Sequence, residues 1–511
     1  MSFPRIAHAC LTVLPALRPR RLASLAVAVP AVAWPALAAA AGTEHAAGAA
    51  GPLGQLPLWS AVPFAGILLS IALFPLLAPH FWHHHYPKVA AGWAALFAAP
   101  FLAWNPLEAA NAIVHIGLVD YVPFLILIWG LYTIAGGIYV GGELRGTPAV
   151  NSLLLLVGTA LASFIGTTGA AMVMIRPLLR ANAERRHRAH VVIFFIFLVA
   201  NIGGALTPLG DPPLFLGFLH GVPFFWVTKG LILHTLVAVA LVLGAFYAVD
   251  TALWRREPAP RAAAPGGARA GVRVEGLRNV PLLLGVGAAV VLSGVLKLPE
   301  VTVFRGGAHP VVVPLQNWAK DVLIVVLGLL SLRLTPAELR ARNGFSWGPI
   351  REVAILFAGI FVTIIPALAI LKAGSEGALA GLVAAVHGPT RFFWATGALS
   401  SFLDNAPTYL TFFNAALGEL GAVEAMVPGM LGHASTLARL NPEFVHDLQA
   451  ISAGAVYMGA MTYIGNAPNF MVKSIAEEAG IAMPSFFGYL FRWSAPVLLP
   501  VFVVVTVLFF R

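Results

Sequence analysis

The sequence predicts an all-α polytopic membrane protein with about ten transmembrane helices and two re-entrant hairpins, arranged as two inverted repeats with broken helices. Three observations carry this prediction. The 511 residues are 59% hydrophobic and only 10% charged, whereas about 25% of the residues in a soluble domain are charged. Apolar windows long enough to cross about 30 Å of hydrocarbon recur along nearly the whole chain. Two pairs of similar motifs interrupt these windows, with one member of each pair in either half.

Composition excludes several classes of protein. The chain is too apolar for a soluble domain or a disordered chain, and it has too few cysteines for a secreted disulfide scaffold. Thirty-one Lys and Arg residues against 21 Asp and Glu residues give a formal charge of +10. In a membrane protein this excess usually lies in cytoplasmic loops, so we expect no nucleic-acid partner. The one cysteine, Cys10, excludes intrachain disulfides and thiolate metal sites.

The first 41 residues have the order of a targeting segment. Arginines at positions 18, 20 and 21 precede an apolar stretch, and small residues follow at 38–41. This order predicts a signal peptide over 1–41, with a first transmembrane helix as the alternative. The segment 42–87 then contains the N-terminal segment and the first span.

The apolar windows give the order of the membrane segments. Two stretches, 149–180 and 392–418, are apolar but interrupted at their centres. Arginines flank the first stretch on both sides, so both of its ends face the cytoplasm and we expect a re-entrant hairpin. The uninterrupted windows lie at 58–78, 88–107, 118–141, 190–219, 225–253, 279–297, 319–334, 350–372, 445–472 and 485–510.

The loops divide the chain into two halves. The segment 254–278 contains six arginines among Pro, Ala and Gly, and we expect a mobile cytoplasmic linker there. The first inverted repeat is predicted at 88–253 and the second at 319–511, with a connecting span and an outer loop at 279–318. Counting crossings from an outside N-terminus puts every arginine-rich loop on one side. We therefore expect a multi-pass protein of the inner (cytoplasmic) membrane, surrounded by the lipid bilayer.

Paired motifs indicate an internal repeat. SFIGTTGAA at 163–171 matches SFLDNAPTY at 401–409, and TPLGDPP at 207–213 matches TYIGNAP at 462–468. Such paired interruptions in inverted halves indicate a transporter binding site near the bilayer midplane. Broken helices free backbone carbonyls for a cation and direct helix N-termini at an anion. The candidate ion- or substrate-binding residues are Thr167, Thr168, Thr207, Asp211, Asp404, Asn405, Thr408, Thr462, Asn466 and Asn469.

Asp211 and Asp404 carry most of the chemistry in these motifs. A bare carboxylate at membrane depth costs several kcal/mol unless it binds a cation, a proton or a basic partner. Neither motif contains Lys or Arg, so Asp211 and Asp404 are candidate Na⁺ ligands for which protons compete. We expect Asp404 to be the principal site and Asp211 its partner. The alternative is that each aspartate only caps a half-helix.

Other titratable residues carry less weight. Asp120, Glu108 and Asp321 lie near span ends, where we expect them to be solvated, and His220 stands alone in the sequence. No phosphate-binding loop, zinc-protease helix or nucleophile elbow is present. We therefore expect no enzyme and no cofactor, with Na⁺ and H⁺ as the transported or coupling ions.

The motifs resemble the ion transporter superfamily, which includes NhaD-type sodium/proton antiporters, arsenite pumps, and citrate and dicarboxylate transporters. The resemblance rests on NIGGALTPLGDPP at 201–213, SSFLDNAPTYLTF at 400–412 and GAMTYIGNAPN at 459–469. It implies two hairpins, two broken helices, a homodimer and elevator-type movement. The Gly-Asp at 210–211 and the Asp-Asn-x-Pro at 404–407 are similar to NhaD-type antiporters in particular.

Two functions remain open at this stage. A sodium/proton antiporter needs a titratable carboxylate and a small inorganic cation. A sodium- or proton-coupled citrate or dicarboxylate transporter needs hydroxyls and helix N-termini facing a small carboxylate substrate. Relatives that carry carboxylates typically have a Ser-Asn-Thr tip in each hairpin. Here the tips read Gly-Thr-Thr at 166–168 and Asp-Asn-Ala at 404–406, a departure that favours the antiporter. The inverted repeat argues against a non-transporting receptor.

Overall fold

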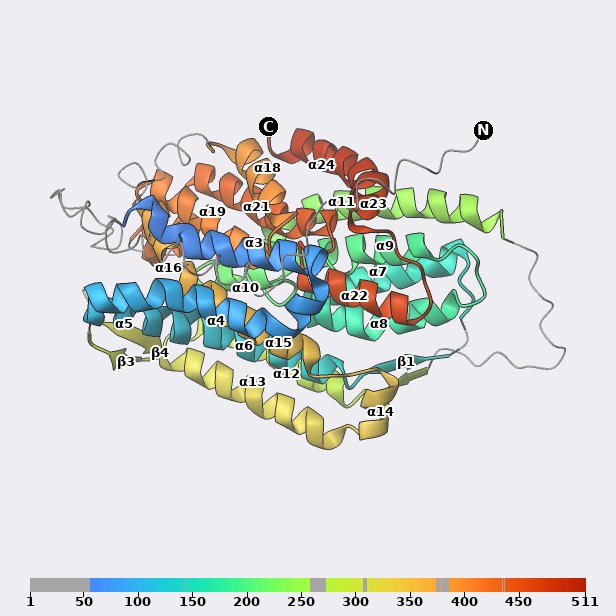
Figure 1. The fold of residues 1–511 in the computed structure, drawn as a ribbon, viewed down its shortest axis with the longest axis horizontal. Coiled ribbons are helices and arrows are strands. Elements are labelled where there is room, and N and C mark those ends of the chain that lie inside the picture. Colours follow the sequence, from blue (N-terminus) through green and yellow to red (C-terminus); the bar gives the residue numbers. More distant parts are fainter. Residues whose placement is uncertain are drawn as a thin grey trace, which may run out of the picture. The chain divides into compact units, whose positions relative to one another are not determined.

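The structure, a computed structural model, describes residues 56–142, 144–257, 273–306, 310–373, 378, 386–433, 435 and 437–511. The predicted signal peptide with Cys10 and most of the predicted linker, 258–272, lie outside these residues. Most of the described chain is helical (Figure 1). This confirms the predicted all-α class.

Most of the helices follow the predicted windows, but the helix at the predicted window 88–107 already begins at Pro79. The α-helices are α3 (Val62–Leu77), α4 (Pro79–Trp104), α5 (Pro106–His115), α6 (Val122–Ala135), α7 (Pro148–Ile165), α8 (Thr167–Ala181), α9 (Ala189–Leu198), α10 (Pro212–Leu219), α11 (Phe224–Trp254), α12 (Asn279–Val295), α13 (Leu315–Leu334), α14 (Ala337–Arg342), α15 (Gly348–Thr363), α16 (Ile365–Lys372), α18 (Pro389–Ser400), α19 (Asn405–Glu419), α20 (Val427–Met430), α21 (Pro442–Met458), α22 (Ala467–Glu478), α23 (Phe486–Tyr489) and α24 (Ala495–Phe509). Short 3₁₀ or π turns are η1 (Leu58–Ala61), η2 (Ile116–Tyr121), η3 (Ile202–Leu206), η5 (Glu424–Met426), η6 (Gly459–Met461) and η7 (Leu490–Ser494).

Many of these helices begin at residues suited to a helix N-terminus. Proline occupies the first turn of α7, α10, α18 and α21, where its missing N–H removes no hydrogen bond. The Thr147 hydroxyl caps α7 by accepting from the Val150 N–H, and the Asn441 side chain caps α21 by accepting from the Phe444 N–H. These local signals explain why the helix starts follow the sequence so closely.

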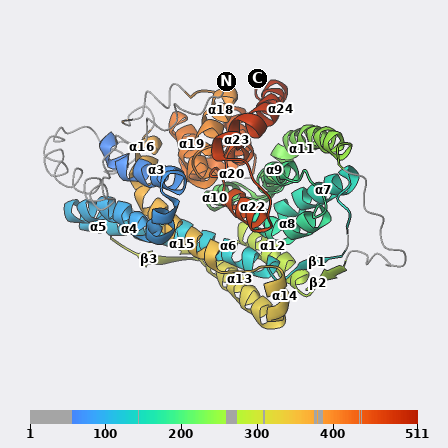
Figure 2. The same cartoon turned by 45° about the vertical axis from the view of Figure 1, so that its right-hand side comes forward.

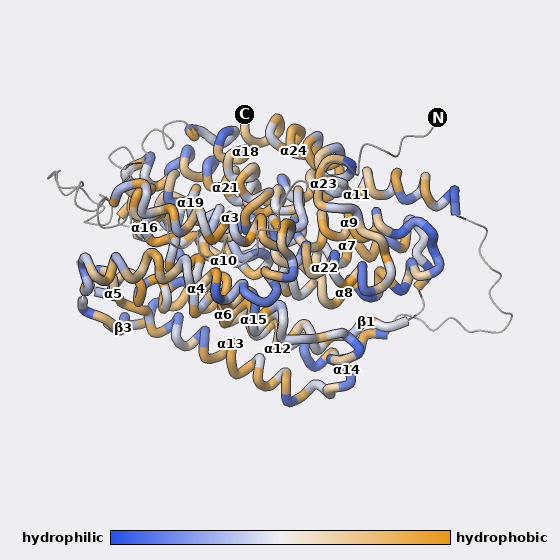
Figure 3. Tube along the Cα trace, viewed as in Figure 1, coloured by the Kyte–Doolittle hydropathy of each residue, from blue (hydrophilic) through white to orange (hydrophobic). Residues whose placement is uncertain are grey.

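Seven helices of the described chain are long and apolar enough to cross a membrane, or up to nine if each of two bent helix pairs is one span. The bent pairs are α15 with α16, at 45°, and α19 with η5 and α20, at 85°. Apolar residues run along most of α11, α13 and α24, whereas hydrophilic residues gather at the C-terminal end of α11 and in the loop after α8 (Figure 3). This distribution is that of a multi-pass membrane protein.

Two groups of helices surround the interrupted segments. The hairpin α7–α8 packs beside α9 and α11, and the hairpin α18–α19 packs with α21 (Figures 1 and 2). Helix α6 lies against α8, α12 and α13, and α10 packs against α19. The two hairpins and the broken segments around η3 and η6 therefore form the centre of the described fold.

Two short β-ribbons were not expected from the sequence. Strand β1 (Tyr139–Gly141) pairs antiparallel with β2 (Arg273–Glu275), in the register Val140 opposite Val274. Strand β3 (Glu300–Phe304) pairs antiparallel with β4 (Val311–Pro314). Because β2 falls inside the predicted linker 254–278, the last residues of that linker are anchored. The predicted start of the first repeat, at 88, also falls inside α4.

Two expectations about isolated charges were wrong. Asp120 is 3% exposed rather than solvated, and its carboxylate lies 3.3 Å from Nε2 of His220, whose Nδ1 lies 2.8 Å from Glu424. Asp321 is 8% exposed and lies 3.2 Å from Nζ of Lys320. Asp120 is paired with a residue distant in the sequence and Asp321 with its neighbour Lys320. Both are buried beside a partner because a buried charge is tolerated only when it is paired.

Candidate functional site

Four helix interruptions meet in the centre of the fold. In the first hairpin, α7 ends at Ile165 and α8 begins at Thr167, with Gly166 between them at φ +78°. The second hairpin breaks between Ser400 and Asn405. The other two breaks separate η3 from α10 and η6 from α22. The Thr167 N–H donates to the Gly210 carbonyl at 2.8 Å, so the first hairpin tip contacts the first broken helix directly.

The same hydrogen bonds recur in both halves. In the first half, the Thr207 hydroxyl donates to the Ser163 carbonyl and accepts from the Leu209 N–H. In the second half, the Thr462 hydroxyl donates to the Ser401 carbonyl, at 2.5 Å, and accepts from the Ile464 N–H, at 3.3 Å. Each threonine therefore joins a broken helix to the hairpin of its own half.

Close backbone approach explains the glycines of the two broken helices. A Cβ added to Gly210 would lie 2.1 Å from the Gly204 carbonyl oxygen, and one added to Gly465 would lie 2.5 Å from the Gly459 carbonyl oxygen. No other residue type fits such a contact. The glycines of the Gly-Asp and Gly-Asn pairs in the sequence motifs are thus required by the crossing of two backbone segments.

Asp211 is the centre of the polar contacts between the four interruptions. Its Oδ1 accepts from the Thr167 hydroxyl at 2.9 Å and from Nδ2 of Asn466 at 3.2 Å, and its Oδ2 accepts from Nδ2 of Asn405. The side chain is 1% exposed. One residue from each of the two hairpin tips and from the other broken helix therefore surrounds a single carboxylate, and all three donors are uncharged.

Asp404 occupies a different position. It is the N-cap of α19, where its Oδ1 accepts from the Ala406 N–H at 3.1 Å, and it is half-buried. Its backbone carbonyl accepts from the Thr408 hydroxyl at 3.0 Å. These contacts are those of a capping residue. Asp211, and not Asp404, is therefore the aspartate that accepts hydrogen bonds from the other helix interruptions.

The remaining predicted residues divide into two sets. Thr168 lines the cavity beside Asp211 and is half-buried. Thr207, Thr408 and Thr462 direct their hydroxyls at backbone carbonyls and hold the helix breaks in place. Asn469 donates to the carbonyls of Gly459 and Thr462, both at 2.9 Å, and so supports the second break in the same way.

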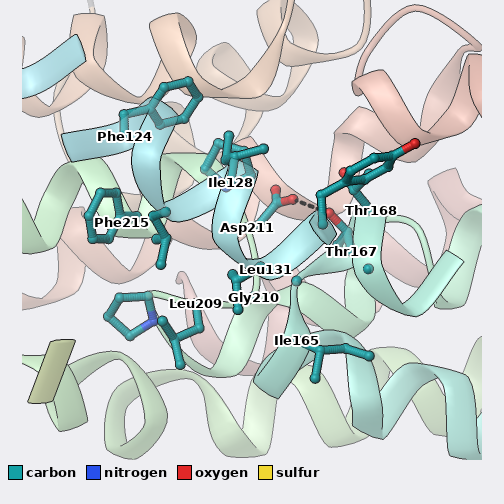
Figure 4. Close-up of a pocket in the computed structure, with 16 residues that line it drawn as sticks. Phe124, Ile128, Leu131, Ile165, Thr167, Thr168, Leu209, Gly210, Asp211 and Phe215 are labelled. Atoms are coloured by element: carbon teal, nitrogen blue, oxygen red, sulfur yellow. Dashed lines mark hydrogen bonds between the residues drawn. The ribbon is translucent and has the colours of Figure 1, made fainter. Parts of the chain in front are cut away.

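A small cavity opens beside the carboxylate, between α6 and the first hairpin tip (Figure 4). Its volume is about 40 Å³, and one water needs about 10–15 Å³ on this measure. Apolar side chains such as Phe124, Ile128, Leu131 and Phe215 form most of its wall. Among the described residues that line it, Asp211 is the one charged residue, and no Lys, Arg or His is present. The cavity has room for a few waters or a small ion.

Two buried amide oxygens near this site have no hydrogen-bond donor among the described residues: Oδ1 of Asn405 and Oδ1 of Asn201. Asn405 already donates to Asp211, and Asn201 donates to Oδ1 of Asn469 at 2.7 Å. Asn201 was missed as a site residue, although it opens the NIGG stretch of the first motif. Unpaired buried oxygens beside a carboxylate are suited to binding a cation.

Helix breaks paired across two halves, around a buried carboxylate in a multi-pass helical protein, define a secondary transporter. The model of the family described as "Putative citrate transport" matches residues 53–510, and the chain belongs to this family. The match agrees with the predicted resemblance to the ion transporter superfamily.

Two curated relatives have names that describe transporters. The chain is 27% identical, over 357 residues, to an uncharacterized transporter of Mycobacterium tuberculosis and to one of Mycobacterium bovis. Each alignment covers 67% of this chain and 73% of the relative. Together with the family, these relatives identify a membrane transporter that acts on a small solute, rather than an enzyme.

Proposed function

We propose that the protein is a sodium/proton antiporter in which Na⁺ and H⁺ compete for Asp211. One observation carries the proposal: a fully buried carboxylate is surrounded by neutral donors, from Thr167, Asn405 and Asn466, and has no basic partner among the residues that line its cavity. A carboxylate at membrane depth without a basic partner is stabilised by a bound proton or a bound cation. Since one carboxylate cannot take both fully, binding of one ion releases the other.

The surrounding oxygen atoms support Na⁺ as the cation. The Thr167 hydroxyl and both carboxylate oxygens of Asp211 lie within one hydrogen-bonded group. Rotation of the Asn405 amide by 180° would direct its unpaired Oδ1 at the same place. Hard cations prefer such oxygen ligands. The helix breaks also leave carbonyls at the C-terminal ends of α7 and α18 that can complete the shell.

A carboxylate transporter is the second candidate function, and two observations favour it. The first is that the family description refers to citrate. The second is that α8, α10, α19 and α22 all begin at the interruptions, and the partial positive charge of a helix N-terminus suits an anion. Against it, the carboxylate of Asp211 already faces the N-termini of α8 and α19. The cavity of about 40 Å³ is also far too small for citrate in this conformation.

One experiment separates the two functions. The purified protein is reconstituted in proteoliposomes, and uptake of ²²Na⁺ and of labelled citrate is measured with and without an imposed pH gradient. The proposal predicts ²²Na⁺ uptake driven by an outward proton gradient and no citrate uptake. Citrate uptake without any proton response to Na⁺ would replace the antiporter with the carboxylate transporter. Because arginine-rich loops usually face the cytoplasm, we also propose that the protein lies in the inner membrane.

A further inference from the structure

A second group of ligand-type side chains lies at the far end of the second hairpin. Asn405 and Glu419 are the first and last residues of α19, so about 21 Å of helix separates them. At this far end, ligand atoms of His387, Glu419 and Glu443 all lie within 4.8 Å of one another. His387 precedes α18, and Glu443 is in the first turn of α21. Three separate elements therefore bring one imidazole and two carboxylates together.

A third carboxylate lies beside this group. Asp447 follows Glu443 by one helical turn on α21, which places both on the same helix face. It is 2% exposed, and its Oδ1 has no hydrogen-bond donor among the described residues. It lies close enough to Glu419, Glu443 and His387 for their charges to act on it. A buried carboxylate is stabilised by a bound proton or by a nearby cation, and a metal ion bound by the neighbouring group would be such a cation.

We propose that His387, Glu419 and Glu443 bind a divalent first-row metal ion, Zn²⁺ or Mn²⁺, at the base of the second hairpin, and that the negative charge of the neighbouring Asp447 strengthens the binding. One imidazole nitrogen with several carboxylate oxygens is a ligand set that both ions accept. Exposed His387 and Glu443 leave the site open to solvent, while buried Asp447 adds a carboxylate oxygen that has no hydrogen-bond donor among the described residues. The bound ion ties α18 and α19 to the start of α21. The predicted orientation places this site on the outer face of the membrane.

Metal binding by the whole protein tests the proposal. The chelator-treated full-length protein in lipid nanodiscs is titrated with Zn²⁺ and then with Mn²⁺ by calorimetry. We expect one ion per chain, with affinity reduced about 10- to 100-fold or more in Asp447→Asn and in Glu443→Gln. Glu443 is exposed, so its variant keeps the fold even where the change at the buried aspartate does not. His446→Ala, at an exposed position on the same helix, is the matched control and keeps wild-type affinity.

A spectroscopic signal distinguishes ligation by the histidine from binding to an acidic surface. Pulsed electron paramagnetic resonance of bound Mn²⁺ is expected to show coupling to an imidazole nitrogen that disappears in His387→Ala. Failure of the wild type to bind either ion, equal binding by Glu443→Gln, or Mn²⁺ without nitrogen coupling would overturn the site. Because none of these measurements involves transport, the site and the antiporter proposal fail independently.

Discussion

Replacing Asp211 by asparagine removes one charge from the centre of the fold and little else. In the structure, Oδ1 of Asp211 accepts from both Thr167 and Asn466, so the amide oxygen of the new side chain can keep these two hydrogen bonds. Its NH₂ group would face Nδ2 of Asn405. Rotation of the Asn405 amide removes this conflict, because Oδ1 of Asn405 has no donor among the described residues and can then accept from the new NH₂ group. We therefore expect Asp211→Asn to fold and insert normally.

The cost to ion binding is much larger. With an effective dielectric constant of about 20, a cation 4 Å from a unit negative charge is stabilised by about 4 kcal/mol. Loss of this interaction corresponds to roughly a 1,000-fold loss of Na⁺ affinity. By contrast, Asp211→Ala leaves the donors of Thr167, Asn405 and Asn466 buried without an acceptor. At about 1–3 kcal/mol for each donor, that variant is expected to lose stability as well.

The assay is Na⁺-dependent proton release from everted membrane vesicles loaded with a fluorescent pH probe. Asp211→Asn should show wild-type expression and melting temperature but no proton response to Na⁺. Asp404→Asn is the matched control, because asparagine is also a good N-cap and keeps an oxygen for the Ala406 N–H. It should retain most of the exchange. Full exchange in Asp211→Asn, or loss of exchange only in Asp404→Asn, would refute the role given to Asp211.

Two further predictions concern the fold around the site. Gly210→Ala places a Cβ 2.1 Å from the carbonyl oxygen of Gly204, so we expect this variant to lose transport in vesicles. The control is Gly244→Ala, whose added Cβ meets no atom of the described residues within 4 Å and which should transport normally. Asp250 accepts from the Arg185 guanidinium at 2.5 Å, and both side chains are at least 96% buried. Asp250→Ala should therefore lower the free energy of unfolding by about 3–5 kcal/mol, which a fall in melting temperature would show. The control is Lys473→Ala, which removes a more exposed ion pair with Glu477 and should change the free energy of unfolding by less than about 1 kcal/mol.

The membrane architecture was readable from the sequence because it depends on local properties. Long apolar windows marked the helices, and Gly and Pro marked the breaks, since a backbone that cannot continue a helix is visible in a few consecutive residues. Gly166, with its positive φ, and Gly210, with its close backbone contact, are breaks of this kind. The repeated Ser-Phe and Thr-x-x-Gly motifs likewise gave the order of hairpin and broken helix in each half.

The roles of the acidic residues depended on contacts between distant segments. Asp211 and Asp404 look equivalent in the sequence, as each follows a helix break. The structure gives Asp211 three donors from segments 44, 194 and 255 residues away, whereas Asp404 accepts from a backbone N–H two residues ahead. Nor could spacing pair His220 with Asp120 and Glu424, or His387 with Glu419 and Glu443. Hydrophobicity and helix breaks act within a few residues and so are written locally, but which buried charge meets which partner is decided only when the helices pack.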